Sequence, residues 1–86
     1  MKDVQDVLEL GKFYFLNKKF QKAIELFQKI VAQEESNFEA TYNLALSYEV
    51  LNELDSAKIF YEKTLEVKPS HKLAKEHLEK VVGNEK

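Results

Sequence analysis

The chain matches itself at an offset of 34 residues, and this internal repeat limits the folds that it can adopt. At this offset identical or similar residues fall on one another: Leu10 on Leu44, Gly11 on Ala45, Tyr14 on Tyr48, Ala23 on Ala57, Phe27 on Tyr61, Lys29 on Lys63 and Ser36 on Ser70. A third, partial copy begins at Ala74 and Leu78, which fall on Ala40 and Leu44. Repeats of this length are supersecondary units that bury their apolar faces by stacking on their neighbours.

The apolar residues of each copy follow the spacing of α-helices. The pattern predicts a first helix from Val4 to about Asn17, with an apolar arc broad enough to touch neighbours on two sides. A turn at Lys18 and Lys19 leads to a second helix over 20–31, and a third helix ends near Asn52, a residue that tolerates the left-handed conformation.

Two further helices complete the pattern. A fourth helix covers 54–65, with Asp55 or its neighbour as the cap and Pro69 closing the segment. Ser70 is the expected N-cap of a last helix that runs from about His71 to Val82, with Gly83 at the C′ position.

Length and composition exclude several classes of protein. At 86 residues the chain has room for one hydrophobic core, and two glycines and one proline are few for a turn-rich β fold. The absence of cysteine excludes disulfides, thiolate metal sites and thiol catalysis, and it fits a cytoplasmic location. No apolar run approaches the roughly 20 residues that span a bilayer, so no membrane insertion is expected. The start at Met1 and the polar end favour a complete small protein.

The charges argue against nucleic acid as a partner. The net charge is −2, and all 13 basic residues are lysines, so the chain neither attracts polyanions at long range nor offers the planar guanidinium that binds carboxylate or phosphate in a bidentate manner.

The order of residue types resembles the tetratricopeptide repeat (TPR) family. Its first-helix pattern reads as Val7, Leu10, Gly11, Tyr14 and again as Thr41, Leu44, Ala45, Tyr48; its second-helix pattern reads as Ala23, Phe27, Ile30, Glu35 and as Ala57, Tyr61, Thr64, Pro69. The resemblance implies an all-α fold, a right-handed helical solenoid of five antiparallel helices. It implies a single domain over 1–86, with repeat one at about 4–37, repeat two at about 38–71 and a capping helix at about 71–83.

In that family the first helix of each pair lines the concave side, which implies a peptide-binding groove and a role as adaptor or scaffold. The groove residues expected from this register are Leu8, Lys12, Phe15, Tyr42, Asn43, Leu46, Glu49, Val50 and His77, with Gln5, Glu9, Leu16, Glu39, Leu73, Glu76 and Lys80 beside them. Asn43 is the strongest single candidate, because its amide can both donate to and accept from a peptide backbone. The alternative is that the apolar members Leu8, Leu46 and Val50 pack between helices.

Some TPR proteins hold the C-terminal carboxylate of heat-shock chaperones with a clamp of two lysines, two asparagines and one arginine. In this register the clamp positions carry Leu8, Lys12, Asn43, Leu73 and His77. Only Asn43 agrees, so the resemblance argues against that ligand.

The sequence offers little for catalysis and implies neither a cofactor nor a metal. His71 and His77 are six residues apart, which on one helix directs them to different faces. The competing hypothesis is self-assembly through the first helix, where Val4, Leu8 and Phe15 have no preceding repeat to cover them. An adaptor predicts a monomer, and a scaffold predicts a weak homodimer that Leu8→Glu would dissociate.

Overall fold

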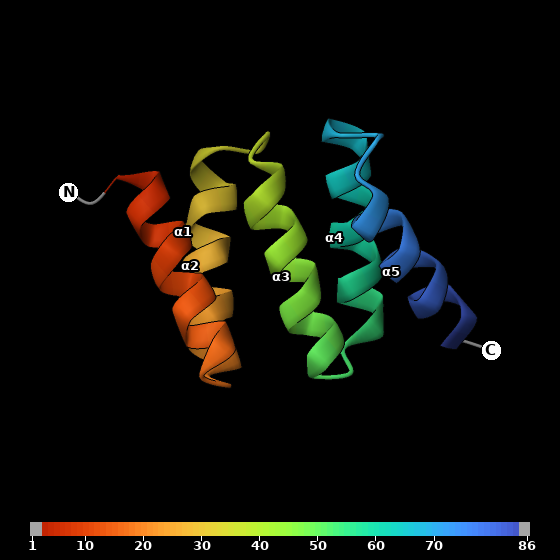
Figure 1. Ribbon diagram of the computed structural model, residues 1–86, viewed down its shortest axis with the longest axis horizontal. Helices are drawn as coiled ribbons and strands as arrows, with labels where there is room; N and C mark the ends of the chain where they lie inside the picture. Colours follow the sequence, from red (N-terminus) through yellow and green to blue (C-terminus); the bar gives the residue numbers. More distant parts are fainter. Residues whose placement is uncertain (1–2, 85–86) are drawn as a thin grey trace.

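The structure, a computed structural model, describes residues 3–84 of the chain. All of the regular structure in this range is α-helical, as the repeat predicts (Figure 1). The helices are α1 (Val4–Leu16), α2 (Phe20–Gln33), α3 (Phe38–Val50), α4 (Leu54–Val67) and α5 (Lys72–Asn84). This order agrees with the expected two helix pairs and one capping helix. The boundaries between the repeats stay a prediction from the sequence.

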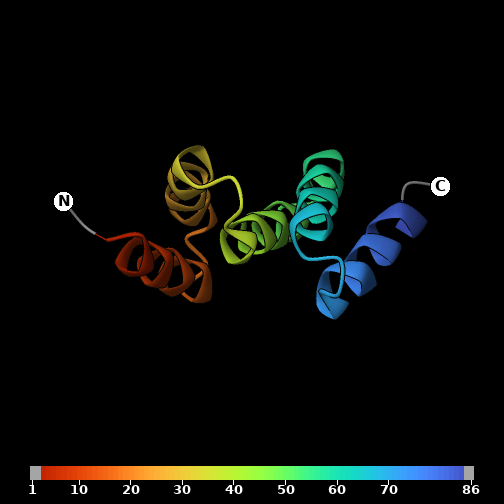
Figure 2. The same ribbon diagram turned by 90° about the horizontal axis from the view of Figure 1, so that it is seen from above.

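Successive helices run antiparallel and form an elongated stack of 43 × 26 × 18 Å (Figure 1). Figure 2 shows α1, α3 and α5 along one side of the stack and α2 and α4 along the other. We call the side formed by α1, α3 and α5 the inner face. Helix α3 packs against both α2 and α4, and α5 packs against α4. The arrangement therefore brings residues from both repeats and from the last helix onto one face.

Three helices begin at a side-chain cap. Asp3 accepts from the amide of Gln5 at the start of α1, and Asn37 accepts from the amide of Ala40 at the start of α3, each at 3.0 Å. At the start of α5 the acceptor is Nδ1 of His71, 3.1 Å from the amide of Ala74. The expectation that Ser70 caps this helix was therefore wrong.

Two other expected helix ends also differ. Helix α4 begins at Leu54 after Glu53, which makes no capping bond, so Asp55 lies within the first turn rather than at the cap. Gly83 lies inside α5 and does not adopt a positive φ angle, so it is not the C′ residue. In both cases the helix extends beyond the expected capping residue, which therefore lies inside the helix.

The turns inside the two repeats have the same backbone conformation. Lys18 and Asn52, which are equivalent at the offset of 34, adopt left-handed φ angles of 63° and 61°. The sequence predicted this conformation for Asn52 but not for Lys18, because lysine rarely adopts it. The geometry of the helix pair, rather than the residue, sets the turn.

Small residues allow the two helices of each pair to approach closely, as the resemblance implies. A Cβ atom added to Gly11 would lie 2.5 Å from Cε1 of Phe27, whose side chain is fully buried. Ala45 occupies the equivalent position in the second repeat and belongs to the same buried cluster as Tyr61. The aromatic residues at 27 and 61 thus fill the core of the first and second repeats.

Candidate functional site

The inner face holds most of the residues that the sequence predicted for binding, with one clear exception. Leu8 is only 1% exposed and belongs to the core cluster formed with Ile24, Phe27 and Leu44. It cannot contact a ligand, and the prediction that it lines the groove was wrong. The alternative reading of Leu8 as inter-helix packing describes its position.

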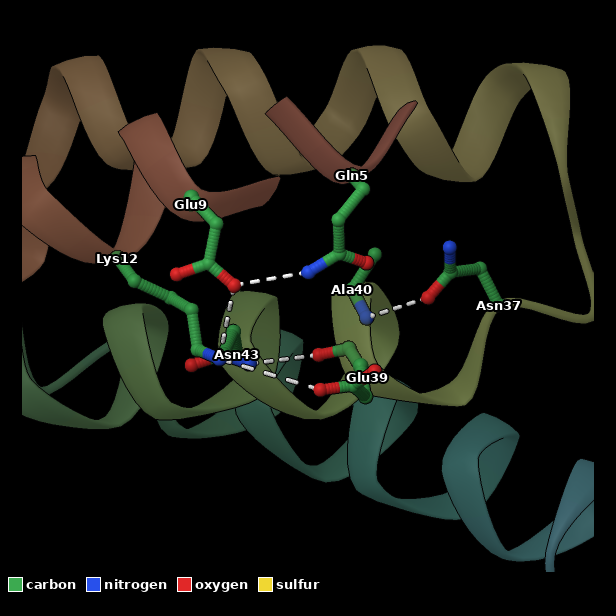
Figure 3. A network of polar contacts seen from close by, with 7 residues as sticks. All are labelled: Gln5, Glu9, Lys12, Asn37, Glu39, Ala40 and Asn43. Atoms are coloured by element: carbon green, nitrogen blue, oxygen red, sulfur yellow. Dashed lines mark hydrogen bonds and ion pairs between the residues drawn. The ribbon is translucent and has the colours of Figure 1, made fainter. Parts of the chain in front are cut away.

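A polar network connects α1 and α3 on the inner face (Figure 3). The side chain of Gln5 donates to Glu9 at 2.8 Å. The ammonium of Lys12 lies 3.9 Å from carboxylate oxygens of both Glu9 and Glu39, so it bridges the two helices. Since all three charged side chains are at least partly exposed, the bridge is weak and can rearrange around a ligand.

Asn43 lies at the edge of this network (Figure 3). Its amide nitrogen donates to the backbone carbonyl of Glu39, one turn earlier in α3, at 2.8 Å. Within the described residues its side-chain oxygen has no hydrogen-bond partner. Asn43 is half-buried, and this oxygen is available to accept a hydrogen bond from a backbone amide.

A second cluster connects α3, α4 and α5 through Glu49. One oxygen of Glu49, Oε1, accepts from the hydroxyl of Tyr61 at 2.6 Å and lies 3.0 Å from Nδ1 of His77. The rings of His77 and Tyr61 stack with their centroids 5.5 Å apart. Glu49 and His77, both predicted for the groove, therefore also hold the last helix to the body of the domain.

Tyr42 occupies the middle of this cluster and contacts both histidines. Its ring centroid lies 4.6 Å from that of His71 and 6.1 Å from that of His77. The prediction that the two histidines point to different faces was wrong, because His71 precedes α5 and does not follow its helical rotation. Two histidines and a tyrosine form an aromatic surface that the sequence spacing did not reveal.

Burial and nearby carboxylates change the titration of these rings. The pKa of Tyr42 is raised, first by burial and then by the negative charges of Glu49 and Glu76. The pKa of Tyr61 is raised by burial and by its hydrogen bond to Glu49. Burial lowers the pKa of His71, and the positive charge of Lys68 adds to this effect. Two carboxylates therefore act on Tyr42, while a lysine acts on the neighbouring His71.

The remaining apolar candidates differ in accessibility. Val50, at the end of α3, is 53% exposed, and Leu46 is half-buried against the second core cluster. Phe15 packs edge to face on Phe20 with a centroid distance of 5.3 Å. Of these residues, Val50 offers the most apolar surface to a ligand.

A separate apolar hollow lies at the first helix pair, outside the inner face. It has a volume of about 270 Å³ and is lined by Val4, Val7, Leu10, Leu26, Lys29, Ile30 and Gln33. The sequence signal was the broad apolar arc of the first helix, which was correctly expected to touch neighbours on two sides. These neighbours are α2 and, to a lesser extent, α3.

Among residues 3–84 there is no group of three or more His, Cys, Asp or Glu side chains that could hold a metal ion. None of the described helices combines the length and the apolar character that crossing a membrane requires.

The fold and the inner face define the class of protein. Five antiparallel helices on a 34-residue repeat, with small residues packed against aromatic ones, form a TPR domain of two repeats and a capping helix. The chain belongs to the family described as "Domain of unknown function (DUF6340)", which matches residues 9–82.

Solved structures support this class. The chain is similar to the crystal structure of MamA, with a TM-score of 0.93 and 28% sequence identity over 96% of this chain, and it spans 48% of that one. It is also similar to the first TPR of Spaghetti (RPAP3) bound to the HSP90 peptide SRMEEVD, with a TM-score of 0.62 and 21% identity, over 94% of this chain and 91% of that one. Among curated proteins no relative matches the chain.

Proposed function

We propose that this chain is a protein-interaction module that binds a peptide or a segment of a partner protein on its inner face, as a cytoplasmic adaptor without catalysis. The similar RPAP3 domain holds a peptide, which supports the class of ligand. An extended or helical segment is the expected occupant, because α3 presents the amide of Asn43 together with the apolar side chains of Leu46 and Val50.

The observation that carries the proposal is the free polar atoms on α3. The hydroxyl of Tyr42 and the side-chain oxygen of Asn43 have no hydrogen-bond partner among the described residues. Leu46 and Val50 follow on the next turns of the same helix. A backbone that bonds to Asn43 would bring its side chains over these apolar residues.

The inner face is poorly suited to an acidic chaperone tail. Of the five positions that correspond to the carboxylate clamp, Leu8 is buried and Lys12 is already engaged by two carboxylates. Leu73 is apolar and 53% exposed, and it offers no charge. Asn43 alone provides the expected chemistry.

The test compares capture of partners from a lysate by wild type and by a variant with Asn43→Ala and Leu46→Lys. Ile59→Lys serves as the control, since Ile59 is 49% exposed on α4, on the opposite side of the stack. Capture that is lost in the first variant and kept in the control supports the proposal. Capture that is kept in both variants places the binding site elsewhere and contradicts it.

A second candidate function is assembly through the apolar hollow at the first helix pair. Three of the residues that line it, Val7, Leu10 and Ile30, are equivalent to Thr41, Leu44 and Thr64 of the second repeat. Those three are fully buried in the stack, with α2 of the first repeat packed against α3. A helix from another molecule would cover the hollow in the way that α2 covers the equivalent residues of the second repeat.

Leu8→Glu is not a valid test of this candidate, because Leu8 is buried and the variant would unfold. Leu26→Glu changes a half-buried residue that lines the hollow. Light scattering on wild type and variant would measure the mass of each. A wild-type dimer that becomes a monomer supports assembly at this surface, whereas a wild-type monomer at high concentration contradicts it.

A further inference from the structure

The charges of the inner face are unevenly distributed. Helix α3, which lies at its centre, carries Glu39 and Glu49 and no basic residue. Helix α1 carries Asp6 and Glu9 and a single lysine, Lys12. Helices α1 and α3 therefore carry four carboxylates and one lysine, whereas α5 carries two carboxylates and three lysines, so the excess of negative charge lies on α1 and α3.

The one lysine on these helices lies next to two carboxylates, which oppose the approach of an acidic ligand. Lys12 lies 3.9 Å from both Glu9 and Glu39, so its charge is already compensated. An anionic ligand would have to displace a carboxylate from Lys12 and would also approach the charges that remain. A cationic ligand would instead replace Lys12 at these two carboxylates or bind beside them.

The cluster around Tyr42 offers the most specific place for a cation. Both hydrogen-bonding contacts of Glu49 use Oε1, which leaves Oε2 without a partner among the described residues. Glu76 precedes His77 in α5, and its charge adds to the raised pKa of Tyr42. The ring of Tyr42 lies beside Tyr61 and His77, which both contact Glu49. An aromatic ring near carboxylates is a favourable site for the ammonium of lysine or the guanidinium of arginine.

We propose that the inner face selects basic peptides, with a lysine or arginine side chain placed over the ring of Tyr42 and against the carboxylates of Glu49 and Glu76. This inference rests on the proposed function and adds the charge of the partner. It is opposite in sign to the acidic peptide held by the similar RPAP3 domain. The flanking apolar contacts of the peptide would be with Leu46 and Val50.

The test is selection from a random peptide library displayed on phage, with the purified chain as bait. The composition of the recovered peptides is compared with that of the input library. The test variant combines Glu49→Gln and Glu76→Gln; the glutamine at 49 retains an acceptor for the hydroxyl of Tyr61. The control combines Glu25→Gln and Glu62→Gln, two exposed residues of α2 and α4 that make the same change in net charge.

The expected result is enrichment of lysine and arginine with wild type and with the control, and loss of that enrichment with the test variant. For the best recovered peptide, the test variant should bind about tenfold more weakly in fluorescence anisotropy, and the loss should shrink at high salt.

Two results would overturn the proposal in different ways. Recovered peptides without a basic excess, whose binding Asn43→Ala and Leu46→Lys abolish, would refute the charge preference and leave the inner face as the binding site. Recovery of no peptide above background by a folded protein would refute both the charge preference and the proposed function.

Discussion

Gly11→Ala should destabilise this protein even though it improves the helix propensity of α1. Alanine is favoured over glycine inside a helix by about 1 kcal/mol, so local preference alone predicts a more stable protein. The repeat points the same way, because the equivalent residue of the second repeat is Ala45. The structure instead predicts that Gly11→Ala lowers the stability of the protein.

The magnitude follows from the contact with Phe27. The new Cβ would lie 2.5 Å from Cε1 and 3.0 Å from both Cδ1 and Cζ of its ring, closer than real Cβ atoms come. The ring is fully buried, so it can move away from the new Cβ only by displacing its neighbours in the core. Overpacking of this kind costs about 3 kcal/mol at the upper end of the usual range, so a net loss of about 2 kcal/mol remains.

Thermal and urea unfolding followed by circular dichroism would measure this difference. For a domain of this size the loss corresponds to a decrease of about 10 °C in Tm. Gly83→Ala is the matched control, since its Cβ would meet nothing within 4 Å and it lies in a helix. It should leave stability unchanged or raise it by up to about 0.5 kcal/mol. Equal effects of the two substitutions would refute the argument from the contact at Gly11.

Three further predictions concern other contacts. Tyr61→Phe removes the donor to Glu49 and should lower the free energy of unfolding by about 2 kcal/mol in urea titrations; an unchanged midpoint would contradict this. Burial and a nearby lysine lower the pKa of His71, so the unfolded chain binds more protons there below about pH 6.5, and acidification should destabilise wild type more than His71→Ser. Parallel stability curves for the two proteins would argue against that role of His71. Leu8→Ala should cost about 2–5 kcal/mol, whereas Leu16→Ala, at a site that is 79% exposed in the same helix, should be nearly neutral.

The sequence predicted the helices well because the evidence for each helix comes from many residues. Each helix rests on several apolar residues at helical spacing, and the second copy repeats that evidence. The helix ends rest on single residues, and there the sequence was less informative. Ser70 and His71 can both accept a bond from the start of α5, and only the path of the chain after Pro69 selects His71.

The residues of the inner face were predicted from their positions in the 34-residue repeat, and such positions do not tell how deeply a side chain is buried. Leu8 and Tyr42 are equivalent at the offset of 34, yet Leu8 is buried and Tyr42 is half-exposed beside α5. The difference arises because the two copies have different neighbours. The convergence of His71 on Tyr42 was also missed, since it depends on a turn whose path no periodicity encodes.

The two repeats have chemically different residues at equivalent positions of the core and the inner face. Where the first repeat has Phe15 and Phe27, the second has Glu49 and Tyr61. A fully buried tyrosine needs a partner for its hydroxyl, and Glu49 supplies it at 2.6 Å. The same oxygen meets His77, so the polar pair also holds α5. In the first repeat the equivalent following helix is α3, which carries Asn43 in the place of His77, and the buried Phe27 has no hydroxyl that needs a partner. The charge that makes the second repeat suited to a basic ligand therefore arises from the way the capping helix is attached.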